Sequence, residues 1–142
     1  MVQFKRAKVT RTDLGLFYSS CIRSIMDYAV PAFHFSLPKY LMQALERIKK
    51  KAMSIICPGV SYHEALVIMN FKVLATHHDE ICESLFHTMV NDNNHRLYKL
   101  LHAPHKSTYS LRHARPLNIP RFKPDRFKNS FIIFSCLKAT NL

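Results

Sequence analysis

The sequence predicts a mainly α-helical protein, a small helical bundle with a basic, proline-containing C-terminal arm and a short apolar terminal segment. Its 142 residues include only two glycines, which leaves few places for the tight turns of a many-stranded β-protein. An apolar share of 48% is ordinary for a globular chain of one domain's length. In several stretches apolar residues recur every three or four positions, the spacing of one helix face. Amphipathic helices that bury one face each are therefore expected.

The most regular of these stretches covers residues 37–66. Its helix is expected to begin at Pro38, which suits a first helical turn, and to end at the Cys-Pro-Gly run of residues 57–59. The stripe expected to be buried is Leu41, Leu45, Ile48, Ala52 and Ile55. The solvated side is expected to hold Lys39, Gln43, Glu46, Lys49 and Lys50. Ser61 and Glu64 then have the spacing of a capping box, which predicts that a second helix starts at once.

An earlier helix is expected between residues 14 and 28. Thr12 or Asp13 would cap it, because either side chain can accept a hydrogen bond from an N–H group of the first turn. Its buried stripe is predicted to be Leu14, Phe17, Cys21, Ile25 and Tyr28. Pro31 is expected to end or kink this helix, and the apolar residues from there to Leu37 are expected to fill the space between two helices.

A third substantial helix is predicted over residues 76–91, and residues 95–101 are expected to add one or two helical turns. The buried side of the longer helix is expected to be Ile81, Leu85, Met89 and Val90, flanked by Cys82 and Phe86. After residue 101 four prolines arrive among arginines and lysines, and the helical period is lost. The last apolar residues are expected to pack back on the helices, as a short strand or as a final helix.

These features divide the chain into four segments: a basic lead-in over residues 1–11, a helical domain over 12–101, a basic extended arm over 102–128 and an apolar terminal anchor over 129–142. The sequence contains no apolar run of the roughly 18 residues that a membrane-spanning helix needs, and no signal-like N-terminus. An intracellular protein of the nucleus or cytoplasm, without a membrane partner, is therefore expected.

Positive charge is concentrated toward the C-terminus. The formal net charge is +12, and residues 96–142 hold 10 Lys/Arg against one acid, whereas residues 1–95 hold 11 against 8. Such a field favours a polyanion, and cations interleaved with aromatic rings suit single-stranded or structured RNA or DNA. The alternative is a solvated tail that its aromatic residues anchor. The residues predicted to bind nucleic acid are Lys49, Lys50, Arg112, Arg115, Arg121, Lys123, Arg126 and Lys128 at phosphates, with Tyr109 and Phe122 as stacking partners.

Catalytic chemistry finds little support in the sequence. His77 and Asp79 have the spacing of the His-x-Asp half of an iron triad, with His113 as a third ligand, but that triad belongs to a β-jelly roll and these residues begin a helix. Zinc-ligand spacing, a nucleophile elbow and a phosphate-binding glycine loop are all absent. The four dispersed cysteines are interpreted as small buried hydrophobes. No catalytic residue, metal or cofactor is predicted.

Six short motifs follow one another along nearly the whole chain. They are YAVP at 28–31, LPKYL at 37–41, ERIKKKA at 46–52, IICP at 55–58, SYHEAL at 61–66 and NSFI at 129–132. Each is soft by itself, because it consists mostly of core and capping residues. In this order they resemble the C-terminal region, after the polymerase palm, of reverse transcriptases encoded by animal non-LTR (LINE-type) retrotransposons.

The resemblance implies a piece of the thumb and connector of an RNA-directed DNA polymerase, whose metal-binding aspartates would lie upstream. It implies RNA and/or DNA as partners, together with the upstream polymerase domain. Related fragments are also filed as the N-terminal region of an AlkB-type homologue that modifies tRNA, a label that brings oxygenase and methyltransferase terms. The expected function is a non-catalytic nucleic-acid-binding fragment. The alternatives are a protein-interaction helical module and an enzyme of the repair-oxygenase class.

Overall fold

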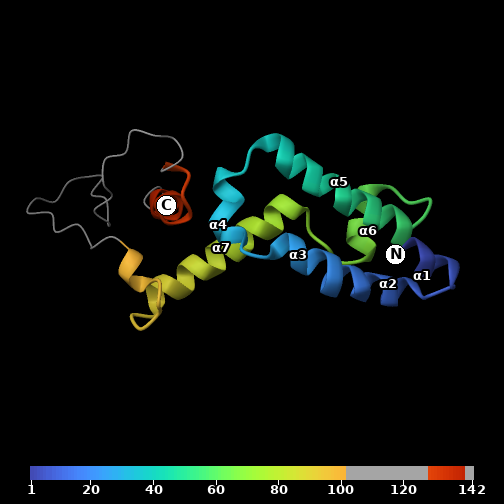
Figure 1. The fold of residues 1–142 in the computed structure, drawn as a ribbon, viewed down its shortest axis with the longest axis horizontal. Coiled ribbons are helices and arrows are strands. Elements are labelled where there is room, and N and C mark those ends of the chain that lie inside the picture. Colours follow the sequence, from blue (N-terminus) through green and yellow to red (C-terminus); the bar gives the residue numbers. More distant parts are fainter. Residues whose placement is uncertain (102–127, 140–142) are drawn as a thin grey trace, which may run out of the picture. The chain divides into compact units, whose positions relative to one another are not determined.

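The computed structural model describes residues 1–101 and 128–139 and confirms the mainly α-helical class (Figure 1). These residues include no β-strand. In chain order the elements are α1 (Val2–Arg6), α2 (Arg11–Phe17), the π-helical η1 (Tyr18–Arg23), α3 (Ser24–Asp27), α4 (Val30–Phe33), the 3₁₀ turn η2 (His34–Ser36), α5 (Lys39–Ile56), α6 (Tyr62–Ile68), α7 (Leu74–Asn91), the 3₁₀ turn η3 (Tyr98–Leu100) and α9 (Phe131–Ala139). Within these ranges no helix is both long and apolar enough to cross a membrane.

The chain divides into two compact units. Unit 1 consists of residues 1–30 and 37–79, and unit 2 of residues 31–36 and the chain from residue 80 onward. Helix α7 therefore contributes its first turns to unit 1 and the remainder to unit 2. This division runs through the stretch 12–101 that the sequence suggested as one helical domain.

Unit 1 is built around α5, which contacts α1, α2 and α6. Its core contains buried residues from α2, η1, α3, α5, α6 and the start of α7. These residues are Leu14, Tyr18, Met26, Ala52, Met53, Ile56, Cys57, Ala65, Leu66 and Leu74. In Figure 1, α6 lies beside the C-terminal half of α5, so the chain turns back on itself after residue 56. Gly59 allows this turn, because its φ of 78° lies in the left-handed region.

The first eleven residues belong to unit 1, although most of their described side chains are exposed. Helix α1 contacts α5, and Met1 and Val9 pack against the core. The ring of Phe4 lies 5.0 Å from that of Phe17, measured between centroids. Arg6, Lys8 and Arg11 remain exposed, and Val2 and Phe4 are also exposed by 49% and 45%.

Helix α2 begins two residues earlier than the nearer of the two predicted caps, Thr12, allows. Thr10 is the N-cap, and its side-chain oxygen accepts a hydrogen bond from the N–H of Asp13 at 3.2 Å. The capping box that starts α6 is confirmed. The N–H of Glu64 donates to Oγ of Ser61 at 3.3 Å, and the N–H of Ser61 donates to Oε2 of Glu64 at 3.1 Å.

The stripe predicted to be buried between residues 14 and 28 is wrong after its first turn. Cys21, Ile25 and Tyr28 are exposed, the last two by 76% and 79%. The residues that face the core are spaced by four: Leu14, Tyr18, Ile22, Met26 and Val30. The reason is the π-helical turn η1, because a π-helix has more residues per turn than an α-helix and rotates every later side chain around the axis.

The buried face of α5 is also rotated from the predicted one. Lys49, Ala52, Met53 and Ile56 are buried, whereas Leu41 and Ile48 are 39% and 50% exposed. Of the stripe predicted from the sequence, Ala52 is buried and Leu45 packs against the core, whereas Leu41 and Ile48 do not face it. Helix α6 packs on the stripe of Met53 and Ile56.

In unit 2 the terminal apolar segment forms helix α9, which decides between the two alternatives that the sequence left open. The ring of Phe35 stacks on Phe134 with a centroid distance of 4.1 Å and on Phe131 at 6.4 Å. In the part of α7 that belongs to unit 2, the buried residues are Cys82, Phe86 and Met89. Cys82 and Phe86, expected to flank the buried side, therefore belong to it. Val90, expected to be buried, is 44% exposed.

Candidate nucleic-acid interface

The structure describes three of the ten residues predicted to bind nucleic acid. Lys50 and Lys128 are exposed, as phosphate contacts must be. Lys49 is buried. The other seven lie outside the described residues: Tyr109, Arg112, Arg115, Arg121, Phe122, Lys123 and Arg126. The site must therefore be built from unit 1, where α5 carries five cations, more than any other described helix.

Lys49 points into the protein, so the prediction that it lies on the solvated face is wrong. Its side chain is only 3% exposed, and Nζ donates a hydrogen bond to the backbone carbonyl of Lys72, just before α7. Burial lowers the pKa of the Lys49 ammonium, while the nearby carboxylate of Glu46 acts in the opposite direction. An ammonium held in this way is not available to a phosphate, and its role is to join α5 to the start of α7.

The only acid of α5, Glu46, is turned toward α6 and α7. Its Oε1 accepts a hydrogen bond from the hydroxyl of Tyr62, and its Oε2 accepts one from the N–H of Leu74 at 3.2 Å. Leu74 opens α7, so the carboxylate lies at the positive end of that helix dipole. Burial and the hydrogen bond to Glu46 both raise the pKa of the Tyr62 hydroxyl. The carboxylate of Glu46 therefore forms its hydrogen bonds inside unit 1.

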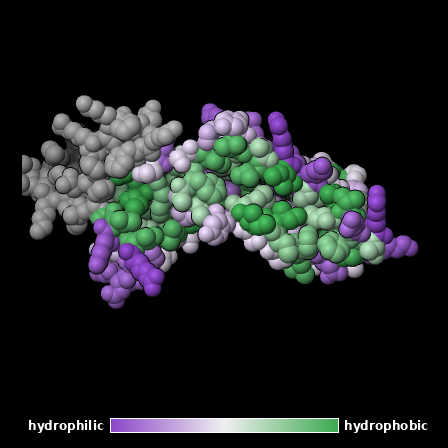
Figure 2. Space-filling view, in the orientation of Figure 1, coloured by the Kyte–Doolittle hydropathy of each residue, from purple (hydrophilic) through white to green (hydrophobic). Residues whose placement is uncertain are grey.

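The outward side of α5 is consequently cationic. Lys39, Arg47, Lys50 and Lys51 are all exposed, and Tyr40 is 68% exposed beside them. Figure 2 shows hydrophilic side chains projecting from unit 1 along the edge where α5 lies. The ammonium of Lys50 also lies 5.3 Å from the centroid of the Tyr62 ring. Sequence reasoning missed Tyr40, Arg47 and Lys51, although their spacing of seven and four places them on one helix face.

Further exposed cations come from the N-terminal end of the same unit. Arg6 ends α1, Lys8 follows it with a φ of 56°, and Arg11 opens α2. All three are exposed, and α1 contacts α5. Unit 1 therefore presents cations from its N-terminal segment and from α5 to solvent. Exposed cations of this kind raise the local concentration of a polyanion.

A second polar cluster of unit 1 is internal and holds helices together. Asp27 accepts from Nε of Arg23 at 3.2 Å and lies 2.9 Å from Nε2 of His77 and 3.1 Å from Nε2 of His78. The same arginine lies 5.6 Å from the centroid of the Phe71 ring. A carboxylate only accepts hydrogen bonds, so both histidines donate from Nε2. The cluster links α3 to the first turns of α7.

The same cluster accounts for His77, one of the residues weighed as an iron ligand. Its partner is Asp27, and Asp79 lies two residues further along α7, where helix geometry turns it to another side. His113 is outside the described residues. Within the described part of the chain, no group of three or more His, Cys, Asp or Glu side chains is arranged to hold a metal ion.

The buried hydroxyl of Tyr18 supports a prediction about pH. Its side chain is fully buried, and the hydroxyl has no hydrogen-bond partner among the described residues. Burial raises the pKa of Tyr18 from 10.0 to about 12. A raised tyrosine pKa means that the folded state holds its proton between pH 10 and 12 while the unfolded state has lost it. The contribution of Tyr18 to the free energy of unfolding is therefore fully present below pH 10 and is lost as the pH rises toward 12.

The variant Tyr18→Phe lacks this ionisable group, so it should lose less stability between pH 10 and pH 12 than the original protein. The difference in the loss of unfolding free energy is expected to be roughly 2 to 3 kcal/mol at pH 12. At neutral pH the variant should be as stable or up to about 1 kcal/mol more stable, because a buried hydroxyl without a partner is removed. Urea unfolding followed by circular dichroism at several pH values measures both effects. Tyr40→Phe is the control, since that exposed residue should change neither value.

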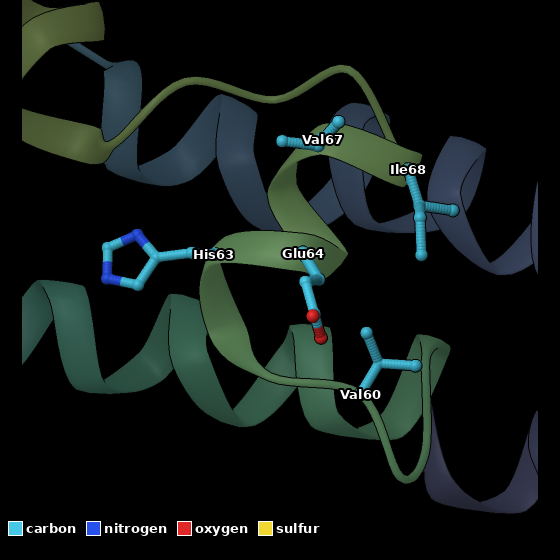
Figure 3. A pocket seen from close by; sticks show the side chains of 5 residues that line it. All are labelled: Val60, His63, Glu64, Val67 and Ile68. Carbon is cyan, nitrogen blue, oxygen red and sulfur yellow. The ribbon is translucent and has the colours of Figure 1, made fainter.

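A small apolar hollow lies beside α6. It has a volume of about 440 Å³ and is open to solvent, and the residues that line it are Val60, His63, Glu64, Val67 and Ile68. Figure 3 shows His63 projecting away from Val60 and Ile68, while the carboxylate of Glu64 serves the capping box. Val67 is 80% exposed. The hollow offers apolar surface but no group of polar side chains that would orient a reacting substrate.

Comparisons with protein-family models, with curated proteins and with solved structures found no match to this chain. The arrangement of α5 therefore has to carry the functional argument by itself.

Proposed function

We propose that this chain binds nucleic acid and does so without catalysing a reaction on it. The observation that carries the proposal is the segregation of charge on α5. Glu46 and Lys49 are bonded inside unit 1, and the remaining cations of the helix face solvent. A net charge of +12 favours attraction of a polyanion, and an exposed cationic face gives it a place to bind.

The resemblance to the C-terminal region of a retrotransposon reverse transcriptase supports the same function. In that setting the chain would hold RNA or DNA beside a polymerase domain that lies upstream and performs the chemistry. The basic segment 102–128 would add phosphate contacts to those of α5. The nucleic-acid-binding residues that we now propose in unit 1 are Lys39, Arg47, Lys50 and Lys51, and Lys49 is no longer among them.

The proposal predicts a steep dependence of affinity on salt. Each phosphate contact adds roughly 0.7 to 0.9 to the slope of log affinity against log salt, so the four contacts of α5 alone give a slope of about −3, and contacts from segment 102–128 make it steeper. A fourfold rise in salt should then weaken binding by roughly 60-fold or more. Fluorescence anisotropy with labelled RNA and DNA oligonucleotides, titrated at several salt concentrations, measures the slope.

Two variants sharpen the measurement. Arg47→Gln should reduce the slope by about one, because it removes one exposed cation from α5. Lys138→Gln should leave the slope unchanged, because the ammonium of Lys138 is paired with the carboxylate of Glu83. Affinity that stays flat from low to high salt would end the proposal.

The second candidate function is a protein-interaction module. It is favoured by exposed apolar side chains of unit 1, notably Leu41 and Ile48 on α5 and Val67 at the hollow beside α6. Surfaces of this kind bind other proteins when they are contiguous over several hundred Å². The salt titration separates the two functions, because an apolar contact weakens little as salt rises.

A further inference from the structure

We propose that the outer face of α5 is a platform for a single strand of nucleic acid, with the ring of Tyr40 stacking on an unpaired base. This inference rests on the proposed function and names the form of nucleic acid that the site takes. It depends on one aromatic residue and on the cations that share its helix face.

The spacing of these residues places them in one line. Tyr40, Arg47 and Lys51 are seven and four positions apart, so they lie within a narrow sector of the helix circumference. At a rise of about 1.5 Å per residue, the first two are separated by about 10 Å along the axis and the last two by about 6 Å. All three are exposed. A strand that follows the helix axis can thus place a base on the ring and successive phosphates beside the two cations.

Tyr40 differs from the other tyrosines of unit 1 in its surroundings. Tyr18 is buried in the core, and Tyr62 donates its hydroxyl proton to Glu46. Tyr28 is exposed, but the charged groups closest to it in sequence, Arg23 and Asp27, are paired with each other. Among the tyrosines of unit 1, only Tyr40 combines a largely exposed side chain with exposed cations on its own helix face. This combination is the one that single-strand binding needs, because aromatic faces stack on bases while cations contact the backbone.

The charge on this face favours a nucleic acid over a protein as the partner. The acid of α5 is bonded on the opposite side, so the outer face presents cations without an acidic residue between them. Such a face complements a continuous polyanion better than a protein surface, on which both signs of charge alternate. The exposed ring favours a single strand, because stacking needs the flat face of a base. In a duplex these faces are covered by the neighbouring base pairs, and only the base edges are exposed in the grooves.

The test compares single strands with duplexes in the full chain. Anisotropy titrations would use oligonucleotides of about 16 nucleotides, as RNA and as DNA, in single-stranded and double-stranded form. Tyr40→Ala is expected to weaken single-strand binding about tenfold and to change duplex binding less than about twofold. Tyr40→Phe should bind as the original does, because the ring is kept. Tyr28→Ala is the matched control, since it removes a ring that is at least as exposed, and the nearest cation in sequence, Arg23, is paired with Asp27.

Each outcome is decisive. If the original protein binds neither form, the proposed function fails and this inference fails with it. If it binds with the predicted salt dependence but Tyr40→Ala is unchanged, or is equally weakened for both forms, only the inference fails. Self-association that Tyr40→Ala removes without loss of oligonucleotide binding would also overturn it, and would identify the face as a protein contact. Circular dichroism of each variant shows that the helices are retained.

Discussion

Replacing Glu46 with alanine is expected to lower the free energy of unfolding by about 3 kcal/mol. Its carboxylate is the acceptor for two donors from different elements, the hydroxyl of Tyr62 and the N–H of Leu74. It is also the negative charge beside the ammonium of Lys49, which is 3% exposed. The substitution leaves two donors without their acceptor where α5, α6 and α7 meet, and it leaves the Lys49 ammonium with only its hydrogen bond to the carbonyl of Lys72. Urea unfolding followed by far-ultraviolet circular dichroism measures the loss.

Two controls separate this effect from a general loss of helix stability. Gln43→Ala lies on the exposed side of the same helix and should change stability by less than about 0.5 kcal/mol. Adding Tyr62→Phe to Glu46→Ala should cost less than the sum of the single changes, because the two side chains share a hydrogen bond. If Glu46→Ala behaved as Gln43→Ala does, the carboxylate would not hold the three helices together.

The helices themselves could be predicted because the signals are local. Apolar residues at steps of three and four predicted α5 and most of α7, and the serine and glutamate of the capping box marked the start of α6. Each signal depends only on residues within a few positions of one another. The pattern is therefore complete in the sequence, whatever the rest of the chain does.

Which face each helix buries could not be predicted as well. The π-helical turn over residues 18–23 rotates the later side chains, and no residue in it announces such a turn. Helix α5 has one apolar stripe through Leu41 and Ile48 and another through Met53 and Ile56, and contact with α6 decides between them. Selection of a face depends on residues far away in sequence, so periodicity cannot determine it.

The candidate site shows the same limit at the level of single side chains. Successive residues of a helix are 100° apart, so Lys49, Lys50 and Lys51 span about 200° and cannot all face one direction. One of them turns inward where it finds an acceptor, and the acceptor is the carbonyl of Lys72, 23 positions away in the chain. The sequence predicted a cationic helix correctly. The choice of the buried lysine came from a contact between distant segments.

The second large effect is expected at Asp27, in the cluster that joins α3 to α7. Replacing it with alanine removes the acceptor for Arg23, His77 and His78 together and is expected to cost about 3 kcal/mol of stability. His78 is fully buried, so its ring N–H cannot turn to water instead. Asp27→Asn keeps one acceptor oxygen and should cost about half as much. Denaturant unfolding at neutral pH measures both values.

An exposed ion pair of unit 2 supplies the matched comparison. Glu83 pairs with Lys138, and their side chains are 49% and 53% exposed. Glu83→Ala also removes a carboxylate from an ion pair, but it should cost less than about 1 kcal/mol because water replaces the lost contact. Equal losses at the two sites would show that the Asp27 cluster is no more than a surface pair. A loss several times larger at Asp27 would show that burial, and not charge alone, makes this cluster hold α3 against the start of α7.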